Sequence, residues 1–339
     1  GPDLESSTEE ELVSVMARVN NVLRRFGSGW ALFFEAQRHE VHDYPEAEFP
    51  DALTWLTDQE RSLQAEEAGT RFESSYYLTL LWLPPADATG RAEKALIQRV
   101  ETEDAATWRH RLETFQQHAD RVFDLLATCL AEIAKLSDDE TLTYLHSTIS
   151  TKRHPVVTPE LPVFLDAILA DEPFAGGLEP MIGEAHLRTL TILGFPATTL
   201  PGILDELNRQ GFAYRWATRF IAMDKAEAEK VLGKKRRHWF AKRKSIGAVL
   251  RETMFNEQAA LVDNDADNKA ADADAALQEL GSDLVSYGYV TTTITVAHPD
   301  RRTVDEHIRV AERIVNGRGF TAIRETLNAV DAWLGSLPG

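Results

Sequence analysis

The sequence is poor in cysteine and contains no long apolar run. One cysteine, Cys129, stands among 339 residues, so no internal disulfide can form, as is usual in a reducing cytoplasm. No apolar run approaches the roughly 20 residues of a membrane-spanning helix, and no secretory signal opens the chain. The sequence starts without Met at Gly1 and stops at Gly339, from which we expect a fragment of a longer protein.

Motifs for nucleotide-dependent or hydrolytic catalysis are also missing. A P-loop needs glycines that free backbone N–H groups, followed by Lys and Ser or Thr for phosphate and Mg²⁺. The only Gly-Lys pair is Gly233-Lys234, which Lys235 follows, and Ala228 stands where the first glycine is needed. No G-x-S-x-G nucleophile elbow occurs either. We therefore expect no catalytic residue, no metal and no cofactor, neither ATP nor Mg²⁺, in this chain.

Positive charge is scarce overall but concentrated in one segment. The formal net charge is −18, which argues against a protein coated in nucleic acid. In residues 234–244, however, cationic side chains flank two aromatic ones. Three interpretations stay open: a protein or membrane-proximal contact, nucleic acid, or a solvated helix whose aromatic residues dock on the second half of the chain. The candidate partner or phosphate contacts are Lys234, Lys235, Arg236, Arg237, Trp239, Phe240, Lys242, Arg243 and Lys244.

Hydrophobic periodicity predicts helices and strands along the whole chain. Residues 74–83 carry apolar or aromatic side chains on both faces, which predicts a buried central strand that the prolines at 84–85 end. A long amphipathic helix is predicted at 102–136, with Cys129 as a small core residue. Another helix is predicted at 49–68, with its apolar residues Phe49, Leu53, Leu56 and Leu63 pointing inward.

The order of the predicted elements is typical of an α/β (α+β) fold. Further strands are expected at 29–41, 186–193, 212–223, 285–297 and 319–323. This order predicts two ferredoxin-like lobes of mixed sheet and helices. The first lobe is expected at 1–150, a helical and loop connector at 151–185, and the second lobe at 186–339. A helical hairpin arm, 224–281, is expected to be inserted in the second lobe.

Two short motifs invite a metal interpretation that their spacing does not support. His39 and His42 are at i and i+3, whereas the H-E-x-x-H motif needs i and i+4 on a helix. Residues 263–268 resemble the start of a calcium loop, but Asn268 replaces the required Gly and Asp274 is too short to replace the bidentate Glu. We expect both segments to be solvated, and a stand-alone metal enzyme using the two histidines is the least favoured alternative.

Several blocks of the sequence resemble the CagE/TrbE/VirB family, the large ATPases of type IV secretion and conjugative DNA transfer, and in particular its TrbE-like conjugal transfer members. The resemblance covers essentially the whole chain, with the blocks in family order. They are GPDLES at 1–6, SSYYLTLLWLPP at 74–85, FAYRWATRFIAMD at 212–224, KRRHWFAKRKS at 235–245, YGYVTTTITV at 287–296 and NAVDAWLGSLPG at 328–339.

The resemblance implies the N-terminal domain of such an ATPase, without its RecA-like ATPase domain. In that family this region has an assembly role: it docks the motor at the cytoplasmic face of the bacterial inner membrane, against inner-membrane channel subunits and neighbouring ATPase copies. The family also implies a hexamer for the full-length ATPase. The expected function is therefore non-catalytic docking, and a nucleic-acid-binding module using Lys234–Lys244 is the alternative.

Overall fold

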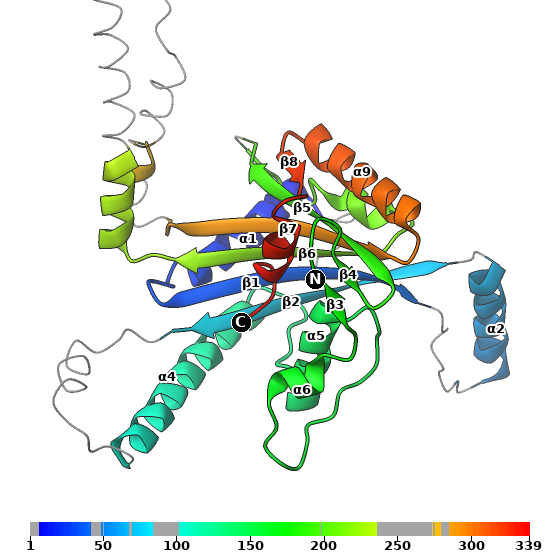
Figure 1. Ribbon diagram of the computed structural model, residues 1–339, viewed down its shortest axis with the longest axis horizontal. Helices are drawn as coiled ribbons and strands as arrows, with labels where there is room; N and C mark the ends of the chain where they lie inside the picture. Colours follow the sequence, from blue (N-terminus) through cyan, green and yellow to red (C-terminus); the bar gives the residue numbers. More distant parts are fainter. Residues whose placement is uncertain are drawn as a thin grey trace, which may run out of the picture.

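The computed structural model contains a central β-sheet with helices on both sides (Figure 1). It describes residues 7–41, 49, 51–67, 70–83, 102–196, 198–235, 273, 275–278 and 285–339. Within these ranges, the mixture of helices and strands confirms the predicted α/β class. None of the helices described there is both long enough and apolar enough to cross a membrane.

The sheet joins strands from both ends of the chain. Its described strands run in the order β2-β1-β6-β7-β5-β4-β3, with β8 paired to β5, and every pairing is antiparallel. β-Branched residues dominate the middle of β7, as suits a strand buried between neighbours. The strands are β1 Trp30–Val41, β2 Arg71–Trp82, β3 Phe174–Ala175, β4 Met181–Ile182, β5 Ala185–Gly194, β6 Tyr214–Ala222, β7 Gly288–His298 and β8 Thr321–Arg324.

Several helices begin at a residue whose side chain caps the first turn. Thr8 and Ser137 each form a capping box with the Glu three residues later, and the Asp300 carboxylate accepts from the Thr303 N–H; such caps satisfy N–H groups that a helix leaves open. The helices are α1 Glu9–Leu23, α2 Ala52–Glu67, α4 Thr102–Ala127, α5 Asp138–Ile149, α6 Leu165–Leu169, α9 Arg301–Gly317, α10 Ala329–Leu334 and the 3₁₀ helix η1 Asp205–Arg209. Residues 225–235 are also helical.

The two faces of the sheet are covered by different helices. The largest apolar cluster, which contains Ile294, lies under α9, and a second, which contains Leu32, packs against α1 and α4. Leu32 is paired with Phe220, and Trp216 with Ile294, so both clusters lie on the same face of the sheet. The opposite face, which is richer in polar groups, is covered by α5 and α10.

The second half of the chain has the strand arrangement of a split βαβ unit. β5 and β6 are both antiparallel to β7, which lies between them, and the chain returns through α9 so that β8 pairs with β5. In the described part of residues 1–150, only β1 and β2 join the sheet, and β1 pairs directly with β6. The prediction of two ferredoxin-like lobes is therefore not confirmed, and the division into domains around 151–185 stays a prediction.

The predicted helical arm leaves the sheet and returns to it at neighbouring positions. Ala222 of β6 is paired with Gly288 of β7, and the Met223 N–H donates to the Tyr287 carbonyl over 2.9 Å. A Cβ on Gly288 would lie 2.3 Å from the Ile221 carbonyl oxygen, so the strands approach too closely there for any other residue. Of the predicted arm 224–281, residues 225–235 form a helix as expected, and most of the rest lies outside the described residues.

The strand predicted at the centre of the sheet lies at its edge. β2 pairs with β1 along its whole length, and no other described strand pairs with its outer side. Leu80 and Trp82 pack into the cluster under α4, while Tyr77 and Thr79, on the other face, contact Tyr144 of α5. Helices above and below therefore explain the two-sided apolar pattern, which does not require a strand on each side.

Two helix predictions were also wrong in part. The α2 residues predicted to point inward, Leu53, Leu56 and Leu63, are exposed, and Figure 1 shows α2 set apart from the sheet, beyond the ends of β1 and β2. The long helix ends at Ala127 rather than near 136, so Cys129 lies half-buried in the turn that follows α4. Periodicity identifies the apolar face of a helix, but it does not show whether another element covers that face.

Candidate functional site

A buried ion pair joins the first and second halves of the sheet. The Glu35 carboxylate of β1 has a fully buried side chain and receives two hydrogen bonds from the Arg215 guanidinium of β6, at 2.6 Å from Nε and 2.6 Å from Nη2. Arg215 also donates to the Ser336 hydroxyl over 2.7 Å and to the Ser336 carbonyl over 2.8 Å. This bidentate geometry satisfies both charges, as a buried ion pair requires. The pair ties β1, β6 and the end of α10 together.

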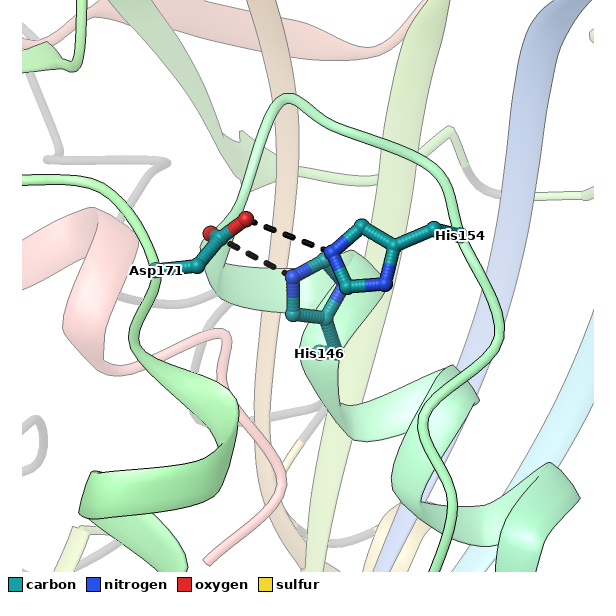
Figure 2. Close-up of side chains that lie close together, drawn as sticks. All are labelled: His146, His154 and Asp171. Atoms are coloured by element: carbon teal, nitrogen blue, oxygen red, sulfur yellow. Dashed lines mark hydrogen bonds and ion pairs between the residues drawn. The ribbon is translucent and has the colours of Figure 1, made fainter.

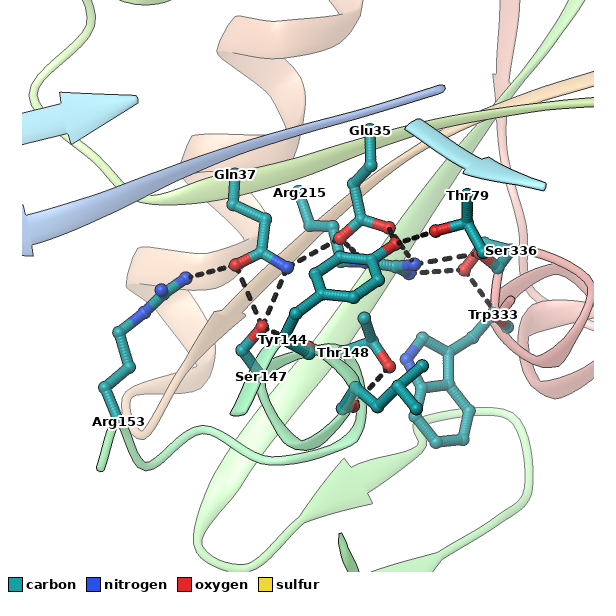
Figure 3. A network of polar contacts seen from close by, with 11 residues as sticks. Glu35, Gln37, Thr79, Tyr144, Ser147, Thr148, Arg153, Arg215, Trp333 and Ser336 are labelled. Atoms are coloured by element: carbon teal, nitrogen blue, oxygen red, sulfur yellow. Dashed lines mark hydrogen bonds and ion pairs between the residues drawn. The ribbon is translucent and has the colours of Figure 1, made fainter. Parts of the chain in front are cut away.

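Helix α5 extends this arrangement across the sheet (Figure 3). The Tyr144 hydroxyl donates to Glu35 over 3.2 Å, and burial, reinforced by the Glu35 charge, raises the pKa of Tyr144 so that it remains a donor. Gln37 exchanges hydrogen bonds with Ser147 and accepts one from Arg153 over 3.0 Å. We call this network the polar seam: Glu35, Gln37, Tyr144, Ser147, Arg153, Arg215 and Ser336.

A pocket of about 460 Å³ opens beside the polar seam. The arginines on its wall already have partners: Arg38 donates to the Gln210 carbonyl, Arg153 to Gln37 and Arg215 to Glu35. These interactions hold the pocket wall together and leave the guanidinium groups engaged. The other lining residues are His39, Glu40, Ser147, Thr148, Ser150, Thr151, Ile182, Leu187, Ala213, Tyr214, Thr295, Ala297 and Trp333.

The outer edge of the sheet is apolar and exposed. Three side chains of β2 and that of Leu83, the residue after it, define this surface, which we call the apolar edge. Their exposed fractions are 69% for Tyr76, 36% for Leu78, 41% for Leu81 and 76% for Leu83. Since β2 has no strand partner on its outer side among the described residues, its backbone can accept another strand there. Helix α2, beyond the ends of β1 and β2 in Figure 1, also carries exposed apolar side chains.

The predicted basic segment lies mostly outside the described residues. Of its nine candidate contacts, the structure describes Lys234 and Lys235, both exposed at the end of helix 225–235. The beginning of that helix is anchored to the loop before β1, because the Ser28 N–H donates to Asp224 over 2.9 Å and the Ser28 hydroxyl donates to Glu227 over 2.7 Å. Contact of the basic segment with a partner or with phosphate stays a prediction.

The histidines singled out by the sequence do not form a described cluster. His39 lies near the end of β1, paired with Glu73, and burial lowers its pKa, with Arg153 as the next cause. His42 lies outside the described residues, as do the calcium-like segment 263–268 and Asp274.

The structure brings together a different set of side chains that could ligate a metal ion. His146 of α5, His154 of the following loop and Asp171, just after α6, lie close to one another (Figure 2). Sequence reasoning missed them because their spacing matches no metal motif, and only the return of the chain along α5 makes them neighbours. The polar seam was missed for a similar reason, since its residues come from four separate parts of the sequence.

Comparison with known families identifies both ends of the chain. Residues 1–90 match the family model "Type IV secretion system ATPase VirB4/TrbE, N-terminal domain". Residues 240–339 match the model "CagE, TrbE, VirB family, component of type IV transporter system". These matches define a component of type IV transport.

Individual relatives cover the chain completely. It is 32% identical over 357 residues to the "Conjugal transfer protein TrbE" of Rhizobium radiobacter, an alignment covering 100% of the chain and 43% of that relative. It is 20% identical over 361 residues to the "Type IV secretion system protein virB4" of Bartonella quintana, covering 100% of the chain and 42% of that relative. The chain belongs to the TrbE/VirB4 family of type IV secretion and conjugal transfer ATPases. It spans less than half the length of these two relatives.

Proposed function

We propose that this chain is a non-catalytic N-terminal domain that docks a longer conjugal transfer ATPase on its secretion channel. The observation that carries the proposal is how the chain aligns with its family. The whole chain aligns with only part, 43%, of a conjugal transfer protein. The matching model for residues 1–90 is described as an N-terminal domain. The sequence itself has no Walker A motif, since Lys235 follows its only Gly-Lys pair. ATP and Mg²⁺ would bind in a further domain of the longer protein.

The apolar edge is the surface best suited to docking. A sheet edge binds a partner strand through main-chain hydrogen bonds, and its side chains select the sequence of that strand. Exposed apolar side chains such as Leu83 are unfavourable in water and become buried when a strand is added. We therefore propose that an extended segment of an inner-membrane channel subunit pairs with β2. The domain would then work at the cytoplasmic face of the inner membrane.

Neighbouring ATPase copies are the second class of partner in this proposal. The full-length ATPase would assemble as a hexamer, as the family resemblance implies. In this proposal the basic segment Lys234–Lys244 makes a second contact. DNA is its less favoured partner, because the chain carries a net charge of −18.

The test is a binding experiment between the 339-residue chain and each inner-membrane channel subunit. We expect one subunit to bind, and Leu83→Lys, a charge placed in the apolar edge, to weaken binding at least about tenfold. Leu327→Lys is the matched control, because Leu327 is equally exposed but lies between β8 and α10. This control should bind as the unmodified chain does. Neither the unmodified chain nor either variant should hydrolyse ATP.

Two results would contradict the proposal. Saturable ATP turnover by the pure chain would show a catalytic domain. Equal loss of binding in both Lys variants, or no loss in either, would remove the apolar edge as the docking surface.

A further inference from the structure

Three potential metal ligands converge beside α5. The His146 Nε2 lies 3.3 Å from one carboxylate oxygen of Asp171, and the His154 Nε2 lies 3.4 Å from the other. Figure 2 shows the carboxylate facing both rings. One ligand atom from each residue can be chosen so that all three lie within 4.8 Å of one another. The three side chains therefore point toward a common centre.

His146 is the most buried of the three side chains and has few polar contacts. It is 1% exposed, its Nδ1 has no hydrogen-bond partner, and its Nε2 has only the 3.3 Å contact with Asp171. Poorly satisfied polar atoms destabilise the fold when they are buried, because the water they lost on folding is not fully replaced. A metal ion bound at Nε2 would replace the contact with Asp171 by a direct metal–nitrogen bond.

His154 is held in the orientation that a metal ligand needs. Its Nδ1 lies 3.2 Å from the Pro155 carbonyl oxygen. A carbonyl oxygen can only accept, so Nδ1 is a donor here, and Nε2 would become a metal ligand by releasing the proton that it shares with Asp171. Metal-binding histidines commonly donate their second ring nitrogen to a backbone carbonyl in this way, which fixes the tautomer.

The spacing and the donor types fit a first-row divalent ion. Ligand atoms bound tetrahedrally at about 2.0–2.1 Å lie about 3.3 Å apart. The two imidazole nitrogens lie 3.3 and 3.4 Å from different oxygens of Asp171, and the three ligand atoms lie within 4.8 Å of one another, so the cluster would contract around a bound ion. Two imidazoles and one carboxylate suit Zn²⁺ and leave a fourth position for water. The Lys152 ammonium, 3.7 Å from Asp171 on an exposed side chain, can move away into solvent.

We propose that His146, His154 and Asp171 form a Zn²⁺ site. Its role is structural, because the ligands join the last turn of α5 to the loop that follows it and to Asp171, two residues after α6. That segment is also held by an apolar cluster around Leu142, Val156 and Leu169 and by hydrogen bonds from Thr151 to Glu172 and from Thr158 to Asp139. A bound ion would fix the helix that covers the polar seam.

The experiment uses the full 339-residue chain, freed of metal by a chelator that is then removed. Calorimetric titration with Zn²⁺ should give one ion per chain, and Zn²⁺ should raise the melting temperature. His154→Ala and Asp171→Asn should each weaken Zn²⁺ binding at least about tenfold and abolish the thermal shift. Both side chains are partly exposed, so these variants should fold where a His146 variant could fail.

His110→Ala is the matched control, since it removes an exposed histidine of α4 outside this cluster. It should bind Zn²⁺ as tightly as the unmodified chain does. Absence of stoichiometric binding would overturn the proposal. So would binding that His154→Ala and Asp171→Asn leave unchanged, because other residues would then hold the ion.

Discussion

The polar seam and the apolar edge lie on neighbouring strands and differ in almost every physical respect. At the seam, the charges of Glu35 and Arg215 are buried and fully hydrogen-bonded. At the edge, Tyr76 and Leu78 are exposed on either side of Tyr77, the residue of β2 that pairs with Glu35. Polar groups therefore join β1 to β6 inside the sheet, while apolar groups are exposed along its outer edge.

The difference shows that the two regions have separate roles: the polar seam fixes the geometry of the sheet, and the apolar edge favours association with a partner. A bidentate ion pair has a narrow range of acceptable distances and angles, so it favours one arrangement of β1 against β6. An apolar surface tolerates many neighbours and gains free energy from any that exclude water. Mutations in the two regions should therefore affect different quantities, the free energy of unfolding at the seam and binding at the edge.

The largest effect is expected from breaking the seam on one side. Arg215→Met should lower the free energy of unfolding by about 3–5 kcal/mol, because the Glu35 charge would remain buried without a partner. The double change of Glu35→Met and Arg215→Met should be less destabilising than either single change. Denaturant unfolding monitored by circular dichroism measures all three values.

An exposed ion pair provides the control for the seam. Glu306 and Arg309 of α9 are 3.4 Å apart and more than half exposed. Glu306→Ala should change the free energy of unfolding by less than about 1 kcal/mol. If Arg215→Met were equally mild, the seam would contribute no more than a surface contact.

A smaller effect is expected at the start of α5, the helix that covers the seam. Ser137 accepts from the Glu140 N–H, and Glu140 accepts in return from the Ser137 N–H. Ser137→Ala should cost about 1 kcal/mol, whereas Ser137→Gly should cost only a few tenths, because glycine is tolerated at this position. Thermal unfolding of the two variants compares them directly, and equal costs would show that the cap does not stabilise α5.

The smallest effect on stability is expected at the apolar edge. Tyr76→Lys replaces a side chain that is mostly exposed, so the free energy of unfolding should change by no more than about 0.5 kcal/mol. The same chemical denaturation measures it, with Leu32→Lys as the contrasting core variant, which should unfold the protein. A large loss in Tyr76→Lys would mean that the edge is part of the core and not a free surface.

Local pattern predicted most of the elements, because each depends on residues close in sequence. The strands β5 and β7 were predicted at 186–193 and 285–297, near their observed bounds. The class of the fold was also correct. These elements repeat apolar residues at strand or helix spacing, which the sequence displays directly.

Strand order was not predictable in the same way. The neighbours of β1 are β2 and β6, and Glu35 and Arg215, which join β1 to β6, are 180 residues apart. No local pattern records such a pairing, and for this reason β2 was placed in the centre. The family resemblance identified the protein class without correcting that placement, because it carried no strand order.

The candidate metal ligands show a related limit. His146 and His154 lie on different elements, and their approach depends on the path of the loop after α5. Their burial could not be judged from sequence either, since a lone histidine on a helix has no pattern that marks it as a ligand. Proximity in three dimensions was the required information.

The inserted arm leaves the sheet and re-enters it at adjacent positions, and this has a consequence for how its length can vary. Because Ala222 and Gly288 are direct neighbours across β6 and β7, the chain leaves the sheet and re-enters it at one point. A segment attached in this way can lengthen, shorten or be exchanged without altering the register of the sheet, since the strands meet at the same point whatever lies beyond.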